Sequence, residues 1–324
     1  MGAIVLTVDV EDYFHVSGFA SCIRPDQWDG YPLRVEASTD RLLSLFDRCN
    51  VRGTFFVLGW LADRAPQLIR RIAKAGHEIA SHGYWHQLVY DQTPEQFRED
   101  LRRSRQAIGE ACGVSVTAYR APSFSITARS LWALDVLLEE GFQVDSSVFP
   151  VRHDRYGIPG ARPDLHLLET QVGPIIEFPP SFGTVAGRRI PIGGGYFRMF
   201  PLAVSRRAIA AVNRQGRPAM FYIHPWEVDP DQPRIGGVPL RNRFRHYVNL
   251  RRTARRLERL VEHARCMTLG EACGSLLIQQ EELASIPASG VTAARSDKSF
   301  HTNHSPGIGL KYPPASGGRQ SPVS

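Results

Sequence analysis

The sequence predicts an α/β fold in which parallel strands alternate with helices packed outside them. Short apolar runs rich in β-branched residues alternate with amphipathic segments of helical spacing. Six or seven such units within about 230 residues favour a (β/α) barrel over an open sheet. Polar residues also follow the ends of several predicted strands, which is where chemistry is located in such barrels.

The strands are predicted where four to seven mostly apolar residues stand between turn residues. They cover residues 4–10, 54–58, 77–80, 117–120, 142–145, 174–178 and 219–223. The helices are predicted where apolar residues recur at helical spacing, and Gly76 and Gly141 follow two of them as C-terminal caps. They cover residues 39–49, 65–75, 94–112, 128–140, 204–213 and 241–259.

The composition is that of a globular protein. Of 324 residues, 43% are hydrophobic and 22% are charged, which excludes disorder of the whole chain. No apolar run reaches the roughly 18 residues that a membrane span needs, and the first residues lack the basic segment of a signal peptide. The five cysteines include no CxxC pair, which argues against a disulfide framework or a thiolate zinc site. We therefore expect a reduced, cytoplasmic protein.

We expect one domain over residues 1–283, with a core at about 3–230 and a helical extension at 231–283. Segment 241–259 holds eight arginines and one glutamate, and the formal net charge of the chain is +7. An anionic partner such as polysaccharide, a membrane surface or nucleic acid is one interpretation of this segment. A solvated helix face that pairs with local acids is the interpretation we favour. Residues 284–324 contain eight Ser, five Pro and five Gly, which is typical of a disordered tail.

Three acids follow the first predicted strand, namely Asp9, Glu11 and Asp12. Asp9 and Glu11 are two residues apart, so an extended backbone points both side chains to the same side. Three carboxylates this close repel one another unless a cation or an arginine compensates their charge. The alternative is a solvated acidic turn.

Two histidines follow the third strand, His82 and His86, and Gly83 between them favours a tight turn. Histidines four residues apart can bind one metal, and neutral imidazole suits zinc and similar divalent ions. The pair is a weak signal by itself, but an acidic group at another strand end strengthens it. One carboxylate and two imidazoles leave positions open for water, as in a catalytic site.

Arg120 and His224 end two other strands. Pro122 stiffens the turn after Arg120, and a rigidly presented arginine suits a carboxylate, although by itself it would be interpreted as a surface residue. His224 begins the stretch His-Pro-Trp-Glu, and its place beside other strand-end polar groups favours a catalytic role over a structural one. Three residues at comparable places could orient it: Asp145, Glu177 and Trp226.

Taken in order, these motifs resemble the five motifs of the polysaccharide deacetylase (NodB-homology, carbohydrate esterase 4) family. The stretches that more closely resemble the subfamily found with exopolysaccharide loci and exosortase systems are TVDVEDYFHV, GHEIASHGYWH, YRAPSFSI, YFRMFP and YIHPWEVDPDQPR. The similarity covers about residues 3–280. It implies that residues 1–283 form a distorted, incomplete (β/α) barrel with catalytic activity.

The resemblance also implies roles for individual residues. Asp9 matches the catalytic base of the family, Arg120 the residue that orients this base, and His224 the general acid. His82 and His86 match its metal ligands, and the expected ion is divalent, with Zn²⁺ as our first choice.

Three positions depart from the family pattern. The usual first motif has two adjacent Asp, but here Val10 follows Asp9, so the metal carboxylate is Glu11 or Asp12, and strand alternation favours Glu11. Ser123 replaces a tyrosine that often helps to form the oxyanion site, and the stretch that begins at Asp145 lacks the expected tryptophan. We assign substrate binding to Trp226, Pro122 and Tyr84.

The expected function is metal-dependent removal of N-acetyl groups from an amino-sugar polymer or its intermediate in exopolysaccharide biosynthesis. The expected partner is therefore an N-acetylated polysaccharide or oligosaccharide, with no nucleic acid and no membrane span. The alternatives are hydrolysis of another C–N bond, in a peptidoglycan sugar amide or a cyclic ureide, and a catalytically silent glycan-binding relative. Nucleic-acid binding through the arginine-rich segment lacks a recognised motif.

Overall fold

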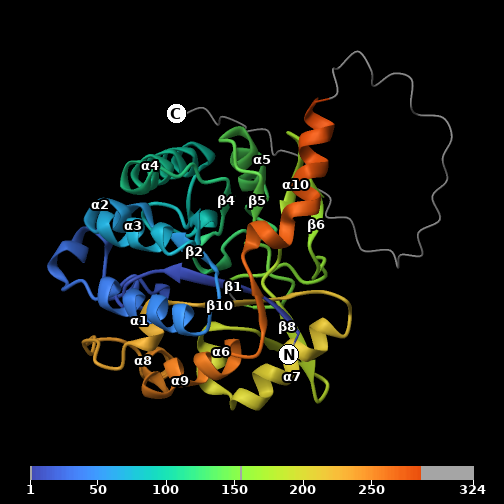
Figure 1. Ribbon diagram of the computed structural model, residues 1–324. Coiled ribbons are helices and arrows are strands. Elements are labelled where there is room, and N and C mark those ends of the chain that lie inside the picture. The colour runs from blue at the N-terminus through green and yellow to red at the C-terminus, as the bar shows by residue number, and fades with distance from the viewer. Residues whose placement is uncertain (1, 154, 286–324) are drawn as a thin grey trace, which may run out of the picture.

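The computed structural model describes residues 2–153 and 155–285 (Figure 1). The expected tail at 284–324 lies outside the described residues except for Ala284 and Ser285, which end the last helix. In the described part of the chain, no helix is long and apolar enough to cross a membrane.

A nine-stranded sheet organises the molecule, with strand order β10-β1-β2-β3-β4-β5-β7-β6 and with β11 paired to β1. Its strands are β1 (Ala3–Val10), β2 (Thr54–Val57), β3 (Glu78–Ser81), β4 (Ala118–Tyr119), β5 (Val144–Asp145), β6 (His166–Glu169), β7 (Pro174–Glu177), β10 (Ala219–Ile223) and β11 (Arg265–Met267). All pairings are parallel except that of β6 with β7. Among the described strands, no pairing joins β10 to β6, so the barrel is incomplete, as expected.

Helices connect these strands and cover the sheet. The α-helices are α1 (Val35–Arg48), α2 (Gly59–Arg64), α3 (Pro66–Lys74), α4 (Pro94–Cys112), α5 (Trp132–Glu139), α6 (Gly194–Met199), α7 (Leu202–Asn213), α8 (Leu240–Tyr247), α9 (Leu250–Val261) and α10 (Leu269–Ser285). Short 3-10 helices occur at Ser17–Phe19, Pro25–Gly30, Val89–Asp91, Pro122–Phe124 and Pro225–Val228. Helix α4 begins with a capping box between Thr93 and Gln96 and ends at Gly113, which has a φ of 73°.

The two faces of β1 have different surroundings because side chains alternate along a strand. Ile4, Leu6 and Val8 belong to the large hydrophobic core. Val5 points to the opposite face, where a smaller apolar cluster includes Leu269 of α10. Helix α10, which runs beside β6 in Figure 1, closes this end of the inner face. The polar positions of β1 follow Val5 on the same face, so they point toward the inside of the incomplete barrel.

Several elements differ from the predictions. The single helix predicted over 241–259 is two helices, α8 and α9, because Val248 is extended and Asn249 adopts a left-handed φ of 57°. The Asn249 side chain donates a hydrogen bond to the backbone carbonyl of Arg198, which fixes this break. The sequence analysis also missed α2, α6, β6, β11 and the hairpin of β8 (Phe182–Val185) and β9 (Arg188–Pro191).

Candidate active site

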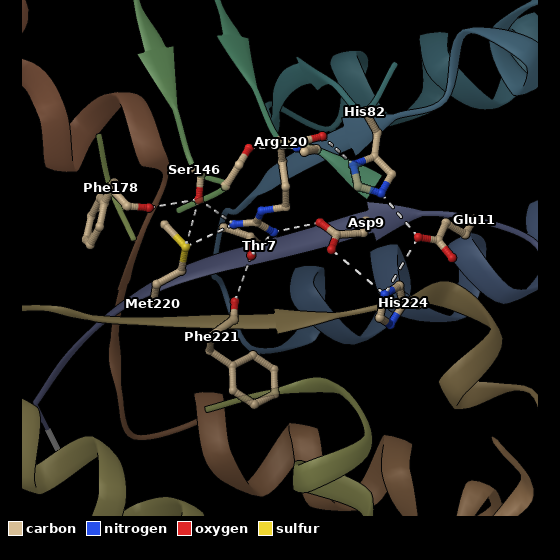
Figure 2. Close-up of polar contacts among 12 residues, drawn as sticks. Thr7, Asp9, Glu11, His82, Arg120, Ser146, Phe178, Met220, Phe221 and His224 are labelled. Carbon is tan, nitrogen blue, oxygen red and sulfur yellow. Dashed lines mark hydrogen bonds and ion pairs between the residues drawn. The ribbon is translucent and has the colours of Figure 1, made fainter. Parts of the chain in front are cut away.

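Polar side chains occupy alternate positions on the inner face of β1 from Thr7 onward (Figure 2). The Thr7 hydroxyl donates to the carbonyl of Phe221 on the neighbouring strand β10, at 2.9 Å. Asp9 is next on this face, and Glu11 follows just past the end of the strand, with 3% and 4% of their surfaces exposed. Strand alternation therefore places the two carboxylates side by side, as the sequence predicts.

Arg120 is completely buried in the centre of this inner face. Its Nη1 donates to Asp9 Oδ1 at 2.6 Å and to Thr7 Oγ1 at 2.8 Å. Its Nη2 donates to Ser146 Oγ at 3.0 Å, and the guanidinium lies 4.0 Å from the ring centroid of Phe56. A buried charge with this many partners has a fixed position. Arg120 therefore holds one oxygen of Asp9 and leaves Oδ2 directed toward His224.

Glu11 meets two imidazoles at the carboxyl end of the sheet. Its Oε1 lies 3.2 Å from His82 Nε2 and 2.9 Å from His86 Nε2, and all three residues are buried. His82 Nδ1 donates to the backbone carbonyl of Arg120 at 2.8 Å, which fixes the ring with Nε2 directed at Glu11. Such a second hydrogen bond is the usual way in which a metal-binding histidine is oriented.

The chemistry of this donor set fits a divalent cation. Two imidazole nitrogens and a carboxylate oxygen converge within 4.8 Å of one another, and they are ligands that zinc and similar ions prefer. Burial raises the pKa of Glu11, but the imidazoles of His86, His224 and His82 outweigh it and hold this pKa well below its usual range. Glu11 is therefore an ionised carboxylate, which is the form that binds a metal.

The turn after β3 orients the side chains of His82 and His86. Gly83 has a φ of 74°, and a Cβ there would come within 2.7 Å of the Asp100 carboxylate. That carboxylate accepts hydrogen bonds from the backbone N–H groups of Tyr84 and Trp85 at 2.8 and 3.0 Å. His86 itself has a φ of 51°, which is uncommon for a residue with a side chain. Helix α4, which carries Asp100, thus holds the unusual backbone that directs His86 toward Glu11.

His224 faces this cluster from the end of β10. Its Nε2 lies 3.8 Å from Asp9 Oδ2 and 3.8 Å from Glu11 Oε1. Its Nδ1 lies 2.7 Å from Glu227 Oε1, whose side chain is completely buried. Burial lowers the pKa of His224, but Glu11 and Glu227 outweigh it and raise this pKa to about 9. These two carboxylates therefore stabilise the protonated imidazole.

Glu227 is in turn held by Arg198, whose Nε donates to Glu227 Oε2 at 2.5 Å. Arg198 Nη1 also donates to the backbone carbonyls of Arg245 and His246 at 2.9 and 2.6 Å. The sequence analysis missed both Glu227 and Arg198. The signal for Glu227 was its position three residues after His224 in a Pro-started turn, a spacing that returns a carboxylate to the first residue of the turn.

Asp145 and Glu177 do not orient His224, although the sequence analysis considered them for this role. They hydrogen-bond to each other, and Asp145 also accepts from Ser147 Oγ at 2.5 Å. Burial, together with the charge of Asp145, raises the pKa of Glu177 well above its usual range. These two acids therefore form a separate buried pair that shares a proton.

The Asp12 carboxylate accepts from backbone N–H groups and is not among the converging donor atoms of Glu11, His82 and His86, which corrects its inclusion among the candidate metal ligands. Its Oδ2 accepts from the backbone N–H groups of Arg34 and Val35 at the start of α1, at 2.7 and 2.8 Å. Its Oδ1 accepts from the N–H of Tyr13 at 2.8 Å. Burial raises the pKa of Asp12 to about 6 despite these bonds. Of the two carboxylates left open by the sequence, the geometry favours Glu11.

A cavity of about 260 Å³ opens beside the cluster. Asp9, Glu11, His86, His224 and Trp226 contribute to its lining, so the assignment of Trp226 to substrate binding agrees with its position.

The other two residues assigned to substrate binding do not line this cavity. Tyr84 is buried, and its hydroxyl donates to Asp63 at 2.6 Å. Pro122 is buried between Ala121 and Ser123, which do line the cavity. Pro122 and Tyr84 therefore shape the loops around the site rather than contact its contents.

Comparison with known proteins gives two adjoining family matches. Residues 27–138 match the polysaccharide deacetylase family, and residues 146–273 match a domain of unknown function, DUF3473. The first segment contains His82, His86 and Arg120, and the second contains His224 and the residues that hold it. The candidate site is thus built from both segments and from β1, which precedes them.

Similar proteins include a peptidoglycan deacetylase of Helicobacter pylori, 31% identical over 35% of this chain and 38% of the relative. A peptidoglycan-N-acetylglucosamine deacetylase of Bacillus cereus is 29% identical over 30% of this chain and 36% of the relative. A chitooligosaccharide deacetylase of a Bradyrhizobium strain is 29% identical over 31% and 43%. The chain thus spans about two fifths of the length of these three relatives.

Among solved structures, a candidate polysaccharide deacetylase from Mycobacterium smegmatis has a TM-score of 0.59 at 22% identity. The similarity covers 87% of this chain and 91% of that one, and it shows a shared fold. The fold and the site define an α/β protein with a buried carboxylate–histidine cluster at the strand ends. Residues 27–138 are thus similar to the polysaccharide deacetylase family, in the family match and in the curated relatives alike.

Proposed function

We propose that the protein is a metal-dependent deacetylase that hydrolyses N-acetyl groups on an amino-sugar glycan. One observation carries the proposal: Glu11, His82 and His86 converge at one point, while His224 faces them across the mouth of the cavity. The names of the relatives support this substrate class, since they refer to peptidoglycan and chitooligosaccharide.

Glu11, His82 and His86 would hold the divalent ion, for which Zn²⁺ is our choice on the donor set. When bound, such an ion acts as a Lewis acid toward the acetamide carbonyl. Asp9 is the general base: Arg120 fixes its Oδ1, and its Oδ2 points toward the cavity to accept a proton from the attacking water.

His224 is the general acid. Its imidazole borders the cavity and is stabilised in the protonated form by Glu227, so it can donate a proton to the amine nitrogen as the C–N bond breaks. This step is needed because an unprotonated amine is a poor leaving group. The products are acetate and a sugar with a free amino group. On the resemblance of its motifs, we place the reaction in exopolysaccharide biosynthesis.

The test is acetate release from N-acetylglucosamine oligomers and peptidoglycan fragments, and ring opening of a cyclic ureide, each with and without a chelator. We expect chelator-sensitive release of acetate from an amino-sugar substrate.

His82→Ala is expected to lose both metal and activity. His224→Ala is expected to retain metal and to lose about 10²–10⁴-fold in turnover. Normal turnover in either purified variant contradicts the assignments, and metal binding without turnover on any substrate favours a silent glycan-binding relative.

A further inference from the structure

Helix α8 exposes two large apolar side chains one helical turn apart. Leu240 is 80% exposed and Phe244 is 65% exposed, the two highest values among the large hydrophobic residues that the structure describes as exposed. Residues four apart lie next to each other on a helix surface, so they form one apolar pair. A paired exposed Leu and Phe on a short helix is a feature that marks a contact surface.

Arginines flank this pair on both sides. At about 100° per residue, Arg241 and Arg243 project to opposite sides of the line between Leu240 and Phe244. Both arginines are exposed, and neither forms an ion pair with a carboxylate among the described residues. Over residues 232–257 the sequence contains eight arginines and no Asp or Glu. The outward face of α8 therefore presents an apolar pair flanked by arginines, in a stretch of sequence without Asp or Glu to balance their charge.

The opposite face of α8 is anchored against the active site. His246 is buried and stacks on Trp226 with a ring-centroid distance of 4.3 Å, and its Nε2 lies 2.5 Å from Gln232 Oε1. Asn242 donates to the carbonyl of Gly18 at 2.9 Å. Both Asn242 and His246 line the catalytic cavity. The helix thus has a fixed orientation, with one face at the cavity and the other exposed beside its mouth.

We propose that the outward face of α8 docks onto a membrane surface that contains anionic lipids. Leu240 and Phe244 would enter the boundary between headgroups and acyl chains, and Arg241 and Arg243 would contact lipid phosphates. Charge complementarity favours this occupant over a second copy of the chain, because a symmetric contact would bring two groups of arginines together. The apolar pair favours it over nucleic acid, which engages arginine without needing exposed leucine or phenylalanine. Docking in this way brings the cavity mouth close to glycans carried at the membrane.

The test is sedimentation of the full chain with vesicles of equal parts phosphatidylcholine and phosphatidylglycerol, and with vesicles of phosphatidylcholine alone. We expect binding to the anionic vesicles only, weakened by salt. The double variant Leu240→Ser/Phe244→Ser is expected to lose at least tenfold in affinity. Arg241→Gln and Arg243→Gln are each expected to lose about fivefold. The matched control is Val172→Ser, which removes another exposed apolar side chain, 52% exposed, and should bind as the wild type does.

Two controls accompany the test. Unchanged thermal unfolding of the variants shows that they are folded, and the salt dependence of wild-type binding is a measurement that needs no variant.

The proposal is overturned if the wild type does not bind anionic vesicles, or if Val172→Ser loses as much affinity as the double variant. It is also overturned if the double variant merely converts a dimer to a monomer, which identifies a second copy as the occupant. Equally tight binding of wild type and double variant to an RNA homopolymer, without vesicle binding, identifies nucleic acid instead.

Discussion

Glu227 links the buried positive charge of Arg198 to the imidazole of His224. Its two carboxylate oxygens contact different partners: Oε1 faces His224 Nδ1, and Oε2 accepts a hydrogen bond from Arg198. The carboxylate both orients the imidazole and stabilises its protonated form, as in other acid–base sites where a second group positions a histidine. Glu227 is thus a positioning residue for the proposed general acid.

Replacing Glu227 with Gln keeps a polar group of the same size but removes its charge. The pKa of His224, raised to about 9 in part by Glu227, should fall, so a smaller fraction of His224 is protonated as the pH rises. We expect the high-pH limb of kcat to move to lower pH, with turnover reduced about 10–100-fold at neutral pH. The measurement is acetate release as a function of pH.

Glu177→Gln is the matched control for this prediction. Glu177 is equally buried, but its pKa is raised well above the usual range, so it is already neutral, and glutamine imitates the protonated acid. Its pH profile should match that of the wild type. An unshifted profile for Glu227→Gln would show that Glu227 does not set the protonation of His224.

Most of the candidate site was predictable at the residue scale, and the reason is geometric. Asp9, Glu11 and His224 each stand at or just past the end of a parallel strand, and such ends meet at one edge of a sheet. Arg198 was not predictable, because it reaches the site from α6 and nothing in its local sequence points to Glu227. Asp12 could not be excluded, because two of its backbone N–H partners, those of Arg34 and Val35, lie more than twenty positions away in the sequence.

At the scale of elements, the junction of β2 and β3 makes stability depend on pH through His77. This residue packs against Phe46 and Phe55, and its Nδ1 accepts from the N–H of Gly53 at 3.3 Å. Burial, and then the charge of Arg52, lower the pKa of His77 from 6.5 to about 4. Between these values the unfolded chain binds a proton that the folded chain does not, so stability is complete above pH 6.5 and is lost as the pH falls toward 4.

His77→Gln removes this titration while keeping a hydrogen-bond acceptor. Between pH 7 and pH 5, we expect the unfolding free energy of the wild type to fall by about 1–2 kcal/mol more than that of the variant. Urea unfolding at the two pH values measures it. His263→Gln, which removes an exposed histidine, should leave the difference unchanged. If His77→Gln also leaves the difference unchanged between the two pH values, His77 is not the source of this pH-dependent stability.

The sequence predicted some elements accurately and missed others, according to how much of the signal is local. Helix α4 was predicted at its observed bounds, because its capping residues and apolar spacing agree with each other. The break between α8 and α9 could not be predicted, because the bond from Asn249 to the Arg198 carbonyl, a tertiary contact, accompanies it. The hairpin of β8 and β9 was missed because its strands, FGTV and RRIP, lack the continuous apolar run that marks a buried strand.

For the whole molecule, binding of a divalent ion should be coupled to stability. An ion that binds the folded chain more tightly than the unfolded chain stabilises it, by about 2.7 kcal/mol at one hundred times its Kd. We expect excess Zn²⁺ to raise the unfolding temperature of the wild type but not that of Glu11→Gln, as measured by calorimetry. Asp12→Asn should retain the increase, since the Asp12 carboxylate is not among the converging donor atoms. Loss of the increase in Asp12→Asn would restore Asp12 as a ligand.

The pairing of β1 with β10 has a consequence for synthesis on the ribosome. One edge of β1 is joined to a strand whose residues follow more than two hundred positions later, as the pairing of Leu6 with Phe221 shows. While the nascent chain is shorter than this, β1 has an exposed edge that can pair with other chains. The growing chain can already contain both histidines of the cluster while His224 has yet to be translated. Chaperone protection during elongation is therefore most needed before β10 emerges.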